Sequence, residues 1–233
     1  MKTSLTSKTL KQHLTYSWWK YLLVVAVAIG LVDLLYSVTA YRSPRDKTLG
    51  VYVYGYMDEQ GLTDYLTDIR ETELSDMEQV SCMLLTNDAT YGPMQLMTYL
   101  ATGEGDLYVL PREEFLNYAA SGSLVPLEED SELLSLFDAA GVSLQSGWRR
   151  ETESGETHLY GIPLEKIPGS GRYVYAEDGY LCMIVTTGNQ PNALKLLRIL
   201  CKDWITEPDL PPAEASSDPT AQPKSAVEDS ESL

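Results

Sequence analysis

The sequence predicts an α/β domain, built on a single mostly parallel sheet with helices on both faces, that follows one N-terminal transmembrane helix. Residues 21–32 form an apolar run without a charge, and this run separates a basic head from an acidic body. Between residues 49 and 122, three strand-like segments alternate with three helix-like segments. Consecutive strand and helix units of this kind favour a parallel sheet with covered faces.

The apolar run is too short to cross a bilayer alone, but its flanks lengthen it. Counted from Trp18 to Tyr36 or Tyr41, it covers roughly 19 to 24 residues, which at about 1.5 Å per residue matches a hydrocarbon core of about 30 Å. The aromatic residues Trp18, Trp19, Tyr36 and Tyr41 then fall at the two interfaces, which amphipathic rings prefer. We therefore expect a transmembrane helix over residues 18–41.

Charge predicts the orientation of this helix. Residues 1–20 carry four lysines and no acidic residue, so the positive-inside rule keeps the amino terminus in the cytoplasm and the body outside the cell membrane. Asp33 lies near the outer end, where water can hydrate it or a basic group of a partner helix can pair with it. A cleaved signal peptide is the alternative, because Val38-Thr39-Ala40 has suitable small residues; Asp33 and the further Leu34-Leu35 favour a signal anchor. No cysteine directly follows the run, which excludes a lipoprotein-type anchor.

The body is strongly acidic. From residue 48 onward it has 10 Lys and Arg against 32 Asp and Glu, a net charge of −22. Nucleic acid and anionic lipid headgroups should repel such a surface, so neither is an expected partner. Composition and pattern divide the chain into a head at 1–17, the helix at 18–41, a linker at 42–47, an α/β domain at 48–206 and a Pro-rich acidic tail at 207–233, which we expect to be disordered.

Three strand and helix pairs make up the first half of the domain. The strands are expected at 49–54, 80–85 and 107–110, where β-branched, aromatic and aliphatic residues run together. Leu62, Tyr65, Leu66 and Ile69 have the spacing of a core-facing helix. The second helix is capped by residues 87–90, has Pro93 in its first turn and ends at Gly103; the third follows Pro111 and ends at Gly122.

Shorter elements are expected in the second half. In order they are an extended piece at 124–127, a helix at 133–139, a polar loop at 143–158, a strand at 159–164, a turn at 168–171, a hairpin of 173–175 with 180–185, and a helix from Asn189 that buries Leu194, Leu197, Cys201 and Trp204. The three cysteines, Cys82, Cys182 and Cys201, have no metal or redox spacing. They are expected as buried thiols, with one Cys82–Cys182 or Cys182–Cys201 bridge as the alternative.

Catalytic patterns are missing from the sequence. His13 lies in the head, and His158 follows a loop with three glutamates but no positioned nucleophile. There is no nucleophile elbow, phosphate-binding glycine loop, zinc ligand spacing or calcium loop. We therefore expect no enzyme activity, no cofactor and no metal.

Two segments together resemble a known family. They are Ala-Thr-Gly-Glu-Gly-Asp-Leu-Tyr-Val-Leu at 101–110 and Phe-Leu-Asn-Tyr-Ala-Ala-Ser-Gly-Ser-Leu-Val-Pro-Leu at 115–127. This order is similar to the first lobe of bacterial extracellular solute-binding proteins, which have the type 2 periplasmic-binding fold and serve sugar-importing ABC transporters. Tyr160-Gly161-Ile162-Pro163 resembles the crossover into the second lobe, and residues 187–195 resemble the return. The resemblance covers about residues 48–204.

The chain departs from this family at one point. Between Pro163 and Gly179 the family inserts a whole second lobe, whereas about fifteen residues intervene here. Because the family captures its ligand between two closing lobes, one lobe offers half a cleft. The resemblance implies a ligand face at Tyr54, Asn87, Tyr91 and Asp106, although for Asp106 a role in capping or anchoring the neighbouring turn is favoured.

Two functions follow as expectations. The first is a non-enzymatic, membrane-anchored extracytoplasmic module, which acts as an accessory or scaffold through contact with another membrane protein. Its membrane residues would be Trp18, Trp19, Asp33 and Tyr36. The alternative is a transport-associated domain that binds or senses a small solute, a sugar or a peptide, at the half-cleft, where a second subunit can supply the other wall.

Overall fold

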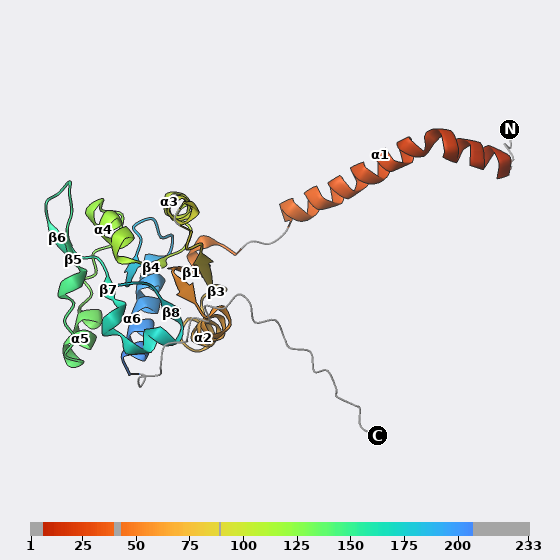
Figure 1. Ribbon diagram of the computed structural model, residues 1–233. Helices are drawn as coiled ribbons and strands as arrows, with labels where there is room; N and C mark the ends of the chain where they lie inside the picture. Colours follow the sequence, from red (N-terminus) through yellow and green to blue (C-terminus); the bar gives the residue numbers. More distant parts are fainter. Residues whose placement is uncertain (1–6, 40–42, 89, 207–233) are drawn as a thin grey trace, which may run out of the picture. The chain divides into compact units, whose positions relative to one another are not determined.

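The computed structural model describes residues 7–39, 43–88 and 90–206 of the chain (Figure 1). It forms two compact units, residues 1–42 and 43–233. The predicted disordered tail and the first residues of the head lie outside the described residues. A single helix, α1 (Ser7–Thr39), accounts for the described part of the first unit and begins inside the predicted head.

The second unit contains a five-stranded sheet. Its strands are β1 (Thr48–Tyr54), β3 (Gln79–Leu85), β4 (Leu107–Leu110), β7 (Ile162–Pro163) and β9 (Tyr180–Met183), in the spatial order β3-β1-β4-β9-β7. β1 pairs in parallel with both β3 and β4, whereas β9 pairs antiparallel with β4 and β7. Only β9 therefore runs against the others, and the predicted mostly parallel sheet is confirmed.

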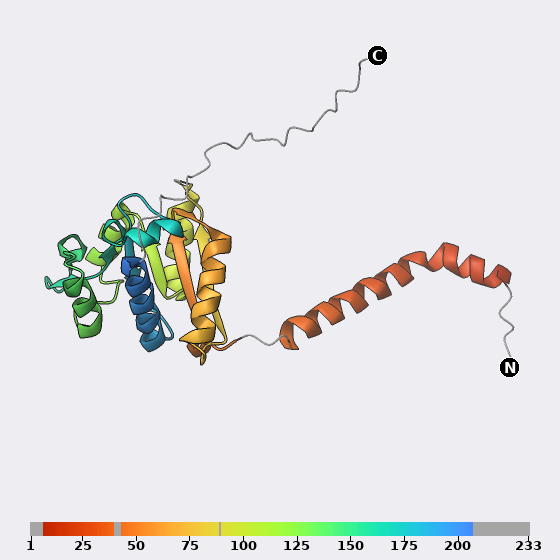
Figure 2. The same cartoon turned by 90° about the horizontal axis from the view of Figure 1, so that it is seen from below.

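Helices cover both faces of the sheet. α2 (Glu59–Thr72), α5 (Ser131–Ala139) and α6 (Gln190–Thr206) pack on one face, and Figure 2 shows α2 and α6 side by side there. α3 (Tyr91–Thr102) and α4 (Arg112–Ala120) pack on the other face. Successive side chains of a strand point to opposite faces, so Val51 and Val53 join the first core while Tyr52 and Tyr54 join the second.

Local capping explains where the helices begin and end. The carboxylate of Asp58 accepts a hydrogen bond from the Gly61 N–H at 3.1 Å at the start of α2. Asp130 does the same for the first turn of α5. α3 ends at Gly103, whose φ of 66° is accessible to glycine at little cost, as the sequence predicted.

The predicted hairpin of residues 173–175 with 180–185 is wrong. β8 (Val174–Tyr175) pairs with β2 (Tyr56–Met57), and β9 inserts between β4 and β7. The short turn between β8 and β9 made a local pairing plausible, but each strand has a partner distant in sequence. These partners depend on the sheet order, which local patterns do not specify.

Two further predictions need correction. The polar loop at 143–158 contains a hairpin of β5 (Trp148–Arg150) and β6 (Thr157–Leu159), whose strands are too short and too polar to stand out in the sequence. The predicted strand at 159–164 is divided, because Leu159 ends β6 and β7 begins at Ile162. The cysteines are free thiols: Cys182 and Cys201 are buried and Cys82 is half-buried, so no bridge forms.

Candidate functional site

Three of the predicted ligand residues lie at the carboxyl edge of the parallel strands. Tyr54 is the last residue of β1, Asn87 lies in the segment after β3, and Tyr91 is the first residue of α3. Asn87 and Tyr91 are exposed. Between them, the carboxylate of Asp88 accepts hydrogen bonds from the N–H groups of Thr90 and Tyr91, both at 2.9 Å, and these bonds lower the pKa of Asp88.

Tyr54 belongs mainly to the core. Its side chain is buried in the second cluster, and a Cβ on Gly92 would lie 2.5 Å from its hydroxyl oxygen. Burial is the main cause that raises the pKa of Tyr54, and Glu114 and Asp88 add to it. The ring therefore packs under the first turn of α3. The edge presents the exposed pair Asn87 and Tyr91 to solvent, with the Tyr54 hydroxyl behind them.

Asp106 lies at the opposite edge of the sheet, away from the other three residues. It precedes β4, and one carboxylate oxygen accepts a hydrogen bond from the Gly50 N–H at 2.8 Å while the other accepts one from the Thr187 hydroxyl. Its side chain is 7% exposed, and this burial raises the pKa of Asp106. These contacts join Asp106 to β1 and to the turn before α6, while the ligand role of the four residues stays a prediction.

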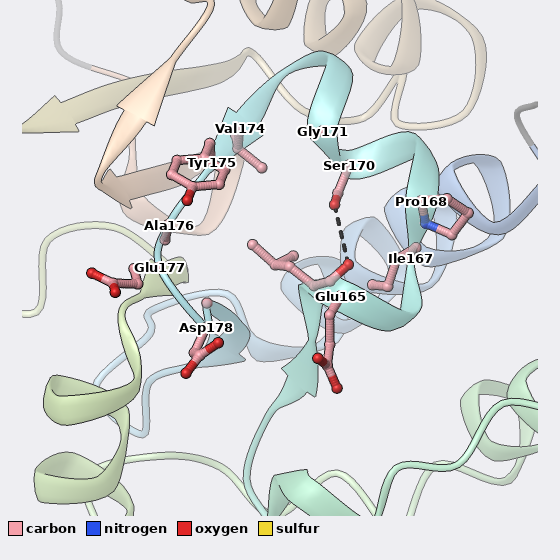
Figure 3. Close-up of a pocket in the computed structure, with 12 residues that line it drawn as sticks. Glu165, Ile167, Pro168, Ser170, Gly171, Val174, Tyr175, Ala176, Glu177 and Asp178 are labelled. Atoms are coloured by element: carbon pink, nitrogen blue, oxygen red, sulfur yellow. Dashed lines mark hydrogen bonds between the residues drawn. The ribbon is translucent and has the colours of Figure 1, made fainter. Parts of the chain in front are cut away.

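Two pockets among the described residues are not lined by Tyr54, Asn87 or Tyr91. One, of about 240 Å³, lies at the amino edge of the sheet and includes Arg45, Tyr52 and Asp106. The other, of about 360 Å³, lies within residues 164–179 (Figure 3). The sequence did not indicate the second pocket, because its walls come from turns that fold back on one another.

An exposed apolar surface on α3 was also missed. Tyr91, Met94 and Met97 follow one another at three-residue spacing and are 66%, 64% and 67% exposed. Met83 of β3 is 41% exposed and points to the same face of the sheet as Leu85, which packs beneath α3. We call these four residues the α3 surface. The helical spacing opposite the buried Leu96 and Leu100 is a signal that could have predicted it.

β3 extends this surface to the edge of the sheet. Among the described residues it pairs only with β1, so its outer side carries no strand. Residues 79–86 contain no charged side chain. Natural edge strands are commonly protected by charges, proline or bulges, because an open edge can pair with another chain. β3 lacks a charge or a proline, and the helix α3 that follows it carries the exposed Tyr91, Met94 and Met97.

The predicted membrane residues all lie on α1. Within this helix, the 20-residue stretch Trp18–Ser37 is long and apolar enough to cross a membrane, a property that a signal sequence near the N-terminus shares. Trp18, Trp19 and Tyr36 are exposed within the unit, and Asp33 is close to the end of the stretch. The two tryptophan rings meet edge to face, with centroids 6.1 Å apart.

His158 occupies the hairpin of β5 and β6. Its Nδ1 bonds the carboxylate of Glu128, whose other oxygen accepts a hydrogen bond from the Leu159 N–H at 3.0 Å. Its Nε2 lies 3.4 Å from a carboxylate oxygen of Glu156. The bond to Glu128 is the main cause that raises the pKa of His158. Within residues 7–39, 43–88 and 90–206, no three His, Cys, Asp or Glu side chains are grouped to hold a metal ion.

Comparison with known sequences finds no matching protein-family model and no matching curated protein. Solved structures do match. An extracellular solute-binding protein family 1 member from Alicyclobacillus acidocaldarius aligns with 52% of this chain and 29% of its own, at 21% identity and a TM-score of 0.38.

Two further solved structures are similar over the same extent. An ABC transporter solute-binding protein from Agrobacterium vitis, with bound D-mannitol, matches at 20% identity and a TM-score of 0.32, covering 50% of this chain and 26% of its own. RafE from Streptococcus pneumoniae matches at 15% identity and a TM-score of 0.33, covering 53% and 29%. This chain thus spans less than a third of each of these proteins. About half of it is similar to part of the extracellular solute-binding proteins, the family that its sequence resembles.

Proposed function

We propose that this chain is a membrane-tethered, extracytoplasmic interaction module whose α3 surface docks a partner protein. The observation that carries the proposal is the exposure of Tyr91, Met94 and Met97 along one helix face beside the uncharged edge strand β3. Contiguous exposed apolar residues are typical of interaction sites, and methionine adapts its shape to a partner. The exposed tyrosine adds a large amphipathic contact of the kind enriched in interface hot spots.

Charge narrows the kind of partner. The body carries a net charge of −22 from residue 48 onward, so a partner with a basic rim around an apolar patch gains electrostatic attraction. In this proposal, α1 is retained as an anchor with its lysine-rich end in the cytoplasm, and the domain is displayed outside the membrane. The anchor confines the module to the membrane plane, which raises its effective concentration near other membrane proteins.

Site-specific photo-cross-linking in the source cell tests the proposal. A photoreactive residue at Met94 should yield a defined adduct, whereas the same residue at Asp138 should not, because Asp138 is exposed on α5, which packs on the opposite face of the sheet. With the photoreactive residue kept at position 94, Met97→Lys should abolish the adduct with little change in stability, since the Met97 side chain is exposed. Equal labelling from both positions, or an adduct that survives the lysine variant, would refute the α3 surface as a docking site.

Solute binding at the carboxyl edge is the second candidate. The observation that favours it is the gathering of Tyr54, Asn87 and Tyr91 at one edge, beside the first turns of α3 and α4. A sugar stacked on Tyr91 would bury about half its surface, so its affinity should be weak. Thermal unfolding of the full chain with hexoses, hexitols, disaccharides and short peptides tests this. Stabilisation that disappears with Tyr91→Ala supports it, and no stabilisation across the panel rules it out.

A further inference from the structure

The pocket at the amino edge of the sheet, of about 240 Å³, is lined mainly by polar groups. It lies between the first residues of β1 and β3 and the turn that precedes β4. A short 3₁₀ helix before β1, η1 (Arg45–Lys47), contributes Arg45. Leu49 is the only aliphatic residue of the lining. The pocket therefore suits a ligand that makes hydrogen bonds.

Tyr52 of β1 extends along the sheet toward this edge. Gly50 lies two residues earlier on the same face of the strand, and a Cβ there would be 2.9 Å from Cε2, the ring carbon beside the hydroxyl-bearing carbon. A Cβ on Gly105, in the turn before β4, would be 2.4 Å from another ring carbon. A larger residue at either position would displace the ring. The two glycines thus allow the ring to lie between them, with its hydroxyl end toward the pocket that Tyr52 lines.

The hydroxyl of Tyr52 has no hydrogen-bond partner within the described residues. The side chain is 9% exposed, and a buried polar group without a partner costs free energy. The neighbouring Tyr108, whose ring centroid lies 5.2 Å from that of Tyr52, donates its own hydroxyl to the Glu104 carbonyl. Burial is the main cause that raises the pKa of Tyr52 to about 12, so its hydroxyl keeps the proton. The pocket therefore contains a buried donor that a ligand can satisfy.

Two neutral side chains of β3 add to this donor. Gln79 and Ser81 line the pocket and point to the same face of β3 as Leu85, which is the face of the sheet that carries Tyr52. The Gln79 amide and the Ser81 hydroxyl make no side-chain hydrogen bond in the described part of the chain. Donors and acceptors from two neighbouring strands thus converge on one space.

The pocket also has two opposite charges that do not pair with each other. Arg45 donates to the Thr102 carbonyl at 3.1 Å, and among the described residues it makes no ion pair. Glu104 lines the same pocket and likewise makes no ion pair within the ranges described. Asp106 belongs to the lining too, but both of its oxygens already accept hydrogen bonds. A ligand that carries both charges would complement Arg45 and Glu104 together.

We propose that this pocket binds a free α-amino acid. The carboxylate of the ligand pairs with Arg45, its ammonium donates to Glu104, and the Tyr52 hydroxyl donates to the ligand from below. Such charge-assisted hydrogen bonds are stronger than neutral ones. The pocket is smaller than the roughly 300–1,000 Å³ that is typical of sites for drug-sized ligands, so it favours a single amino acid over a peptide. A ligand with one charge would leave Arg45 or Glu104 without a partner.

The site is separate from both surfaces that the proposed function uses. None of its lining residues belongs to the α3 surface, and it lies at the opposite edge of the sheet from Tyr54, Asn87 and Tyr91. The proposal therefore goes beyond the proposed function and can fail without it. Because Arg45 immediately precedes β1, a bound amino acid would tie this segment to the turn before β4.

Isothermal titration of the full chain in detergent micelles with the standard L-amino acids tests the proposal. We expect at least one of them to bind at millimolar concentration or below. Two matched probes follow for each amino acid that binds: its amide, which keeps only the ammonium, and the corresponding α-hydroxy acid, which keeps only the carboxylate. Each should bind at least about tenfold more weakly. No binding by any amino acid, or a singly charged probe that binds as tightly as the amino acid, would overturn the proposal.

Two variants check the location of the site. Glu104→Gln removes the partner of the ammonium and should weaken binding at least about tenfold. Tyr52→Phe removes only the hydroxyl and should weaken binding about two- to tenfold. Since this hydroxyl has no partner among the described residues, Tyr52→Phe should unfold in urea at the same concentration as the parent or at a higher one.

Each variant has a matched control. Glu153→Gln removes an exposed acid from a different loop, and Tyr99→Phe removes a hydroxyl from a ring that meets Tyr52 edge to face but does not line the pocket. Both should retain the affinity of the parent. Unchanged affinity in Glu104→Gln and Tyr52→Phe, or equal loss in their controls, would contradict the assigned site. Earlier unfolding of Tyr52→Phe would show that its hydroxyl has a structural partner and would remove the basis of the proposal.

Discussion

Replacing Asp106 distinguishes a structural role from a ligand role at this position. In Asp106→Ala, the buried Gly50 N–H loses its carboxylate partner, which should cost about 1–3 kcal/mol. Loss of the bond from Thr187 adds about 1 kcal/mol, because this half-buried hydroxyl can turn partly to water. We therefore expect the free energy of unfolding to fall by about 2–4 kcal/mol. Asp106→Asn keeps one oxygen acceptor for Gly50, and should cost less than about 1 kcal/mol.

Urea unfolding of the full chain in detergent micelles, followed by tryptophan fluorescence, to which the buried Trp204 contributes, measures these differences. Circular dichroism at the same urea concentrations checks that both signals report one transition. If Asp106→Ala is as stable as the parent to within about 0.5 kcal/mol, the anchoring role is refuted. If the asparagine and alanine variants lose equal stability, the acceptor bond from Gly50 is not the cause.

The pH dependence supplies an independent check on Asp106. Burial raises the pKa of this carboxyl in the folded state above its ordinary value of 3.8. The folded protein therefore holds this proton more tightly than the unfolded chain, and the associated stabilisation is complete below the ordinary pKa and is lost as pH rises through the raised one. Relative to Asp106→Asn, the parent should gain stability as pH falls through that window. A constant difference between the two proteins would contradict the raised pKa.

Three further outcomes are expected. Glu128→Gln should lower the raised pKa of His158 toward its ordinary value, measured by proton NMR titration of the imidazole, and an unchanged pKa would exclude the carboxylate bond as its main cause. In the parent, the stability linked to His158 is complete below its ordinary pKa of 6.5 and is lost as pH rises through the folded pKa. An aromatic disulfide reagent should label Cys82 in the native protein, whereas Cys182, buried and with its pKa raised by burial, should react only on unfolding; early labelling at Cys182 would contradict the packing. Gly92→Ala should lose about 1–3 kcal/mol in urea unfolding, since its Cβ would lie 2.6 Å from a backbone carbonyl oxygen, and a neutral result would show that the first turn of α3 yields readily.

Sequence patterns located the ligand residues only in part. Tyr54 and Asn87 follow strands of the predicted parallel sheet, and such positions share the carboxyl edge, where the structure also has them. Asp106 precedes β4 and therefore lies at the opposite edge, a consequence of strand direction that the sequence analysis did not use.

Features that depend on neighbouring residues could be predicted from the sequence. The apolar stretch of α1, the strands β1, β3 and β4, and the helices between them all follow from hydrophobic spacing and capping within a few residues. The parallel direction of these strands follows too, because a helix carries the chain back between each pair. The apolar N-terminal helix and the α/β class were therefore predictable without the structure.

Features that join distant segments could not be predicted from the sequence and are visible only in the folded chain. β8 pairs with β2 and β9 inserts between β4 and β7, because these strands satisfy backbone hydrogen bonds with partners far away in sequence. The pocket within residues 164–179 forms for the same reason. Its walls are turns that are held together by hydrogen bonds across the segment, such as that from the Leu164 N–H to the Gly179 carbonyl. Exposure is likewise a property of packing. Met94 and Leu96 are both apolar residues of α3, and only the sheet beneath α3 leaves the first exposed and buries the second.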